Sequence, residues 1–235
     1  MKTRRALLSL FMTATVAAAG LSAAAPAIAE SDESVATDFS LPAQNRAVAP
    51  AVAPVGSWNH LSGIRGYRQE RSNWCGPASA KTALSNWTDV RVNSSTQAYF
   101  AKKMGTNSAG FTTPVAMGRE MTNYINASWG TKGTKYAAHR SITNGKLWEG
   151  VVSFAQWDRS ALIVLVRQRA VHPNAPKAAA HYLTITAWNE NLNGKGRAYR
   201  AWDSGWGSNG RYITFYAKNW EKMAYAGKLV VAPRF

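Results

Sequence analysis

Cys75 is the only cysteine of this 235-residue chain, and it lies in the sequence QERSNWCGP, six residues after Gln69. A thiol acts as a nucleophile in its thiolate form, and its pKa near 8.5 falls at a helix N-terminus or beside a protonated histidine. The residues after Cys75 favour a helix that carries Pro77 in its first turn. We therefore interpret Cys75 as a candidate nucleophile. The alternative is a small buried side chain without a chemical role.

A nucleophilic thiol needs a base, and the chain has four histidines: His60, His139, His172 and His181. His60 lies near a linker, and His139 and His172 fall in predicted loops, whereas His181 opens the run HYLTITAW, which is typical of a strand. Rigid backbone has to hold a catalytic base, which favours His181. Asp203 ends the next predicted strand, where a hairpin would bring it to His181 as the orienting group. An aspartate at this place is also common simply as the start of a turn.

Attack of a thiolate on an amide carbonyl builds negative charge on the carbonyl oxygen, and preplaced N–H groups stabilise that charge. The backbone N–H of Cys75 and the side-chain amide of Gln69 are the candidates for this role.

Together these residues resemble the papain-like cysteine peptidases, and more narrowly the peptidase C39-like family. The runs WCGPAS and HYLTIT match best, and the similarity extends over residues 66–231. The resemblance implies Cys75 as nucleophile, His181 as base, Asp203 as orienter and Gln69 as oxyanion donor. In that family proline often follows the orienting aspartate, whereas this chain has Ser204.

The resemblance implies hydrolysis of a peptide or protein substrate, including a cell-wall peptide, through a thioester and without a cofactor. The same architecture also serves peptidoglycan hydrolases, leader-peptide processing domains and transamidases. Trp74 and Trp206 are candidates for substrate binding. One cysteine and scattered histidines give no zinc-ligand spacing, so no metal is expected. Residues 205–210 fit G-x-G-x-x-G, but they precede a predicted strand and indicate a turn, not a dinucleotide site.

The first 29 residues have the composition of a secretion signal. A basic start (Lys2, Arg4, Arg5) precedes a short uncharged apolar run and Ala27-Ile28-Ala29, a small-x-small cleavage pattern. We expect residues 1–29 to be removed and the protein to be secreted, without a membrane span after cleavage; an uncleaved anchor is the alternative. Residues 30–57, acidic and then rich in Ala, Val and Pro, indicate a linker or short pro-segment. Residues 58–235 suit one catalytic domain.

The predicted domain is strongly basic. Of the chain's 28 Lys+Arg and 12 Asp+Glu, residues 58–235 hold 24 and 8, a formal charge of +16. Such a field attracts polyanions. For an exported protein these are anionic wall polymers or acidic proteins, and no nucleic acid is expected. The scattered charges also fit a merely solubilising surface. A catalytically silent module that binds wall polymers is therefore an alternative to the peptidase, as is a transamidase.

The periodicity of apolar residues predicts helices in the first part of the domain and strands in the second. Apolar stripes at helical spacing predict helices over residues 75–87, 94–104, from 113–114 through 125, and around 147–155. Apolar and β-branched runs predict strands over residues 161–166, 181–188, 197–203, 211–216 and 228–232. Helices followed by closely connected strands predict an α+β domain of papain-like type, in which the helix that begins at Cys75 packs on a mostly antiparallel sheet.

Overall fold

The computed structural model describes residues 56–85, 87, 96–133, 135–157, 160–175, 179–205 and 210–233. The predicted signal segment, nearly all of the predicted linker, and Trp206 lie outside these residues. Within the described part of the chain, no helix combines the length and the hydropathy that crossing a membrane requires.

The described residues form an α+β fold, as the order of elements in the sequence predicts. The helices are α1 (Cys75–Leu84), α2 (Thr96–Lys103), α3 (Pro114–Trp129), α4 (Asn144–Trp157) and α5 (Trp220–Met223). The strands are β1 (Asn59–His60), β2 (Tyr136–His139), β3 (Leu162–Arg167), β4 (Ala180–Asn189), β5 (Ala198–Asp203), β6 (Arg211–Tyr216) and β7 (Val230–Pro233). Three single 3₁₀ turns follow strands or loops at residues 168–170, 192–194 and 217–219.

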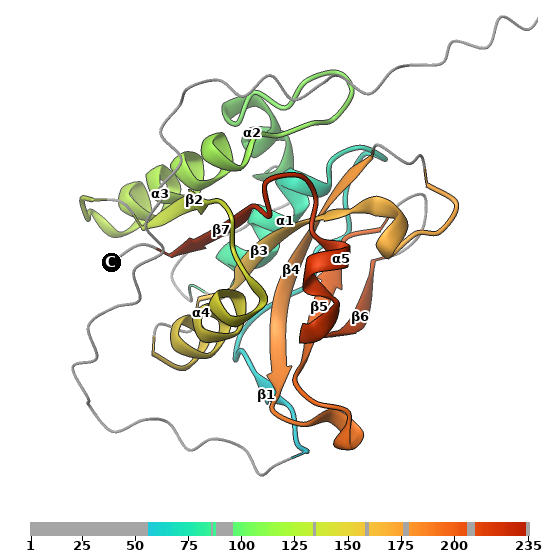
Figure 1. Ribbon diagram of the computed structural model, residues 1–235. Coiled ribbons are helices and arrows are strands. Elements are labelled where there is room, and N and C mark those ends of the chain that lie inside the picture. Colours follow the sequence, from blue (N-terminus) through green and yellow to red (C-terminus); the bar gives the residue numbers. More distant parts are fainter. Residues whose placement is uncertain are drawn as a thin grey trace, which may run out of the picture.

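The strands form one antiparallel sheet in the order β2-β7-β3-β4-β5-β6, with β1 paired to the far end of β4. Strands β3 to β6 follow the chain as neighbours. The C-terminal strand β7 instead inserts between β2 and β3 (Figure 1). Figure 1 shows α4 and α5 in front of the sheet and α1 behind it, so apolar side chains fill both sides of β3 and β4. The long run of buried residues in these two strands follows from this double cover.

Helix α1 lies deep in the molecule, with every residue after Cys75 buried. Its small side chains allow close contact: a Cβ on Gly76 would lie 2.7 Å from Thr112 Oγ1. Thr184 of β4 donates a hydrogen bond of 3.2 Å to the carbonyl of Ser79, which ties the helix to the sheet. The nucleophile helix therefore packs on the sheet as predicted.

Helix α1 begins at the predicted residue and ends at Leu84, three residues before the predicted end at Trp87. The hydroxyl of Ser85 donates to the Thr82 carbonyl at 2.6 Å and accepts from the Arg65 N–H at 2.8 Å. These side-chain bonds to the backbone take the place of further helical hydrogen bonds, so the helix ends here.

The prediction that His139 lies in a loop is wrong. It ends the short strand β2, which pairs with β7, and its side chain is buried. The run YAAH contains two alanines, which are poor strand formers, so local propensity does not indicate a strand. Pairing with the distant C-terminal segment creates it.

Candidate active site

The N-terminus of α1 presents Cys75 as its first residue, and the thiol is partly buried. At this position the backbone N–H has no partner within the helix. Trp74 is the N-cap residue, and the guanidinium of Arg71 stacks 4.4 Å from the centre of its ring. Trp74 directly precedes Cys75 in the chain and stays a prediction for substrate binding, while Trp206, the second aromatic candidate, lies outside the described residues.

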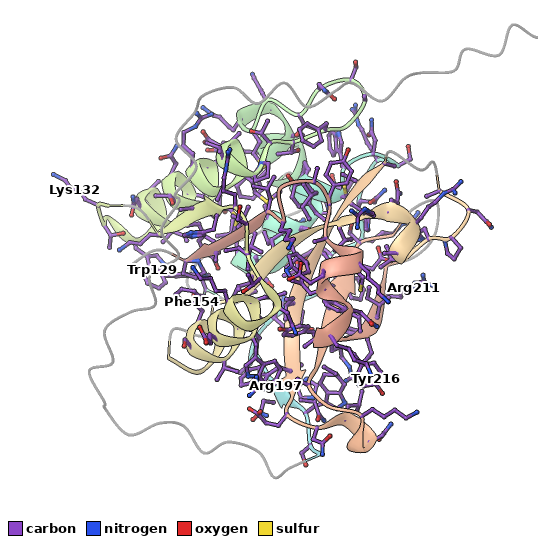
Figure 2. All side chains as sticks on the ribbon, in the orientation of Figure 1. Trp129, Lys132, Phe154, Arg197, Arg211 and Tyr216 are labelled. Carbon is purple, nitrogen blue, oxygen red and sulfur yellow. The ribbon has the colours of Figure 1, made fainter. Side chains whose placement is uncertain are left out.

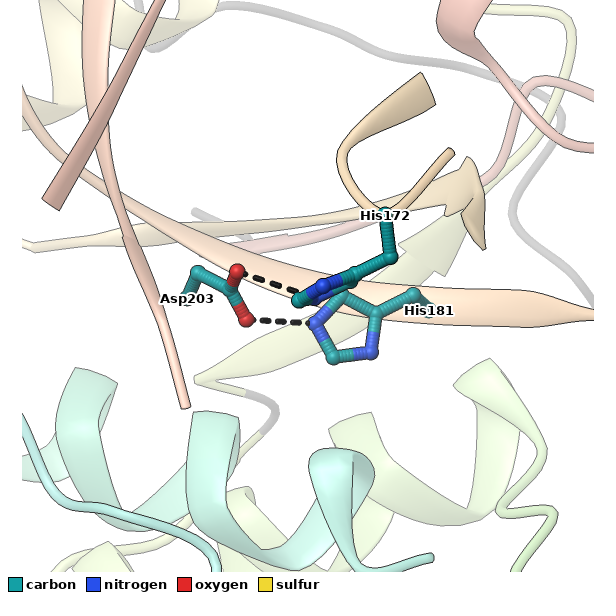
Figure 3. Close-up of side chains that lie close together, drawn as sticks. All are labelled: His172, His181 and Asp203. Carbon is teal, nitrogen blue, oxygen red and sulfur yellow. Dashed lines mark hydrogen bonds and ion pairs between the residues drawn. The ribbon is translucent and has the colours of Figure 1, made fainter. Parts of the chain in front are cut away.

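Antiparallel pairing of β4 and β5 brings His181 and Asp203 together. Leu183 is the partner of Asp203 in the register, and His181 lies two residues before it on the same strand. The His181 Nε2 is 2.8 Å from Asp203 Oδ1, and both side chains are fully buried (Figure 3). The Gly205 N–H donates to the same Oδ1 at 3.0 Å. The hairpin contact predicted from the sequence is therefore present, and Asp203 also organises the turn that follows it.

The carboxylate changes the acid–base properties of its histidine. Burial alone lowers the pKa of His181, but the hydrogen bond to Asp203 and the interaction with Cys75 outweigh it and raise the pKa to about 9. For Asp203, burial works to raise the pKa, whereas the bond to His181, its charge and the Gly205 N–H lower it to about 2. Near neutral pH this pair is an imidazolium beside a carboxylate.

The thiol of Cys75 interacts with the imidazole of His181. Burial works to raise its pKa, but the interaction with His181 and the backbone N–H groups of Tyr182 and Gly76 lower the pKa below the ordinary value. Among the described residues, His181 Nδ1 is buried and has no hydrogen-bond partner. In Figure 3 this nitrogen points away from Asp203. It is therefore free to exchange a proton with the thiol.

Gln69 is buried and fixed by Ser204, the residue after Asp203. Its backbone N–H donates to the Ser204 carbonyl at 3.0 Å, and its Oε1 accepts from the Ser204 hydroxyl at 3.2 Å. Its Nε2 donates to the Ser72 carbonyl at 2.6 Å. An amide NH₂ has two hydrogens, so one remains for an oxyanion. The serine that stands where the family often has proline thus holds Gln69 in one orientation.

His172 was not singled out by the sequence, yet it lies at the same carboxylate. Its Nε2 is 3.0 Å from Asp203 Oδ2, and its ring meets that of His181 edge-on, with 5.3 Å between the centroids. The Arg211 Nε lies 3.6 Å from the same oxygen. The dipeptide His172-Pro173 in a loop carries no local signal for this role, because the fold of the loop alone brings it to Asp203.

The three side chains of Figure 3 also form a set of potential metal ligands. One donor atom from each of His172, His181 and Asp203 lies within 4.8 Å of the others. The expectation that the histidines are too scattered for a metal site is therefore wrong for these two. Two imidazoles and a carboxylate suit zinc or a similar ion. The neighbouring Arg211 guanidinium opposes a cation at this place, and the observed pairs already satisfy the carboxylate by charge.

Comparison with known proteins gives one family. The model of the peptidase C39-like family matches residues 61–228, which includes every described candidate residue. No curated protein matches the chain. The match covers both the helical segment that carries Cys75 and the strands that carry His181 and Asp203.

Proposed function

Because the chain belongs to the peptidase C39-like family, we propose that it is a secreted cysteine peptidase that uses Cys75, His181, Asp203 and Gln69. The observation that carries the proposal is that the two ring nitrogens of His181 have different surroundings. Its Nε2 hydrogen-bonds to Asp203 at 2.8 Å, its Nδ1 has no hydrogen-bond partner among the described residues, and the ring lowers the pKa of Cys75. This is the arrangement that a nucleophile, a base and an orienting group require.

In the first half of the proposed reaction, the Cys75 thiolate attacks the carbonyl carbon of a peptide bond. The electron pair of the carbonyl moves to the oxygen, where the Cys75 N–H and the free Gln69 N–H stabilise it. When the tetrahedral intermediate collapses, the C–N bond breaks and His181 gives its Nδ1 proton to the leaving amine. The acyl group remains on sulfur as a thioester.

In the second half, water attacks the thioester and His181, now neutral, takes its proton. The C–S bond breaks, the acid leaves, and the thiolate–imidazolium pair forms again. Asp203 keeps its charge throughout and stabilises the imidazolium that is present at the start and the end of the cycle. The proton that His181 gives to the leaving amine is replaced by the one that it takes from water, so the cycle balances.

We propose a peptide amide as the substrate, with peptides of the cell wall among the candidates. The predicted signal at residues 1–29 supports export, and the +16 charge of residues 58–235 supports attraction to anionic wall polymers or acidic proteins. The same charge is the observation that favours the second candidate, a silent module that binds such polymers.

The first test uses residues 30–235 and the matched variant Cys75→Ala. Both are incubated with a mixture of peptides and with isolated cell-wall peptides, and new amino termini are detected by mass spectrometry. We expect cleavage by the wild-type protein and none by the variant. In parallel, the rate of alkylation of Cys75 by iodoacetamide is measured against pH, and we expect an apparent thiol pKa below 8.5 that rises in His181→Ala.

The outcomes separate the candidate functions. An unreactive thiol, or one that titrates normally and ignores His181, contradicts the peptidase; retention of an anionic wall polymer by Cys75→Ala then favours the binding module. A transamidase would form a conjugate when a primary amine is added, whereas a peptidase forms only the acid.

A further inference from the structure

The two oxygens of Asp203 have different partners. Oδ1 accepts from His181 and from the Gly205 N–H. Oδ2 faces His172 at 3.0 Å and Arg211 at 3.6 Å, and it makes no hydrogen bond of good geometry among the described residues. The catalytic proposal uses Oδ1 alone. A fully buried carboxylate oxygen that carries charge and lacks a proper hydrogen bond requires an explanation.

The loop that carries His172 is built against this oxygen. The 3₁₀ turn after β3 begins at Gln168, whose carbonyl accepts the His172 N–H at 2.8 Å. Arg211, the first residue of β6, donates from Nη2 to the carbonyl of Val171 at 3.0 Å. The same guanidinium therefore contacts both the carboxylate and the loop. Figure 2 shows Arg211 extending from the sheet beside this loop.

Rotation about the Cβ–Cγ bond of an aspartate would move both oxygens together. A contact that fixes Oδ2 therefore also fixes the direction of Oδ1. We propose that His172 is a positioning residue which, with Arg211, holds Asp203 Oδ2 so that Oδ1 stays aligned with His181 Nε2. The effect of His172 on catalysis rests on the proposed function. Its effect on the alignment of Asp203 with His181 can be tested without a substrate.

The charges around His172 suit this role at neutral pH. Burial is the largest influence and lowers its pKa below 6.5, against the attraction of Asp203, and the neighbouring His181 and Arg211 lower it further. A neutral imidazole with its proton on Nε2 still directs an N–H dipole at Oδ2 over 3.0 Å, although the contact lacks good hydrogen-bond geometry. It adds no positive charge beside the His181 imidazolium. In acid, a protonated His172 would compete with His181 for the carboxylate.

The experiment compares three variants of residues 30–235. His172→Phe keeps an aromatic ring of similar size but removes the donor, His172→Gln restores a neutral donor, and His60→Phe is the matched control. His60 is exposed on β1 and pairs with Ala187, six residues along β4 from His181. Two quantities are measured: the proton NMR signal of His181 Nε2–H, and the rate at which iodoacetamide alkylates Cys75 across the pH range.

In His172→Phe we expect the Nε2–H signal to move upfield and broaden. The apparent thiol pKa should rise by about one unit, which slows alkylation at pH 7 about tenfold, because a less aligned carboxylate stabilises the imidazolium less. His172→Gln should recover most of both effects, and His60→Phe should match the wild type. Arg211→Gln, a change at a half-exposed side chain, tests the same oxygen should His172→Phe fail to fold, and its effects should have the same sign.

The inference is overturned if a folded His172→Phe, or Arg211→Gln in its place, keeps the wild-type NMR signal and alkylation profile. Loss of stability without any change in these two readouts would also overturn it, because it would indicate a purely structural residue. Failure of the proposed function looks different: the wild-type thiol would titrate normally or no peptide would be cleaved. The NMR signal would still report whether His172 aligns the carboxylate.

Discussion

The two ends of the β4–β5 pair are both buried and polar, yet their polar groups are used differently. At one end Asn189 pairs with Ala198, and its side chain is satisfied: Oδ1 accepts from the Asn191 N–H and Nδ2 donates to the Gly56 carbonyl, both at 2.9 Å. At the other end, among the described residues, His181 Nδ1 and Asp203 Oδ2 lack good hydrogen bonds. In Figure 2, Arg197 and Arg211 mark these two ends.

The two ends therefore differ in whether their buried polar groups are fully hydrogen-bonded. A satisfied amide closes a turn and contributes to stability alone. At the Asp203 end, buried charges lie in pairs, and His181 Nδ1 has no hydrogen-bond partner among the described residues. Such a group lowers the stability of the fold, and a role in a reaction would explain why it is retained. Substitutions at the two ends should therefore separate activity from stability.

The largest expected effect is that of His181→Ala. Loss of the proton-transfer group should lower kcat/KM about 10⁴-fold, because the thiolate and the leaving amine both depend on it. Peptide cleavage by the folded variant, checked by circular dichroism, measures this. Activity within tenfold of the wild type would show that His181 is not the base.

Asp203→Asn should have the next largest effect, about 10²- to 10³-fold on kcat/KM, because a neutral amide does not stabilise the positive charge of the His181 imidazolium. In the wild type, activity needs a thiolate and a protonated His181, so it should fall as pH rises through about 9, where His181 loses its proton. Without the carboxylate the pKa of His181 falls, and the alkaline limb of the pH–rate profile should move to lower pH. An unchanged limb would mean that Asp203 does not set this pKa.

Ser204→Ala should have a smaller effect, about tenfold on kcat at similar KM, because one oxyanion donor loses its fixed orientation. Thr186→Ala removes a comparable hydroxyl, which donates to the Arg200 carbonyl at 3.2 Å further along the ladder, and serves as the control. Steady-state kinetics of both variants compare them. Equal values would indicate that the Ser204–Gln69 bond is only structural.

Asn189→Ala should have the smallest effect on activity, within about twofold, but should cost about 1–3 kcal/mol of unfolding free energy, because two backbone groups lose their partner. Urea unfolding monitored by tryptophan fluorescence measures the free energy, and peptide cleavage measures the activity. A large loss of activity in a stably folded variant would contradict the view that the Asn189 end of the β4–β5 pair is structural and only the Asp203 end is catalytic.

Much of the fold follows from local patterns. The start of α1 at Cys75 and the bounds of β6 agree with the sequence prediction, and α3 begins at Pro114, within the predicted start at 113–114, where the Thr113 hydroxyl accepts from the Ala116 N–H. These signals are local: an apolar stripe, a β-branched run, and a capping residue before proline. Strand β2 was missed because its partner lies about 90 residues further along the chain.

The residues of the candidate site also fall into those that local sequence patterns predict and those that only the fold brings to the site. The sequence indicated Cys75, His181, Asp203 and Gln69, because each lies in a recognisable local context or in a run that resembles a known family. It did not indicate His172, Arg211 or Ser204. These residues reach the site through a loop, an adjacent strand and a buried turn, and no spacing along the chain predicts such contacts.

The sequence by itself determined which residue types can react and which segments become helices and strands, because reactivity and backbone propensity are properties of short stretches of chain. The tertiary structure alone decided that β7 lies between β2 and β3 and that two histidines share one carboxylate. The physical reason is that burial and charge pairing depend on distances in space, and folding brings together groups far apart in sequence only when the whole sheet has formed.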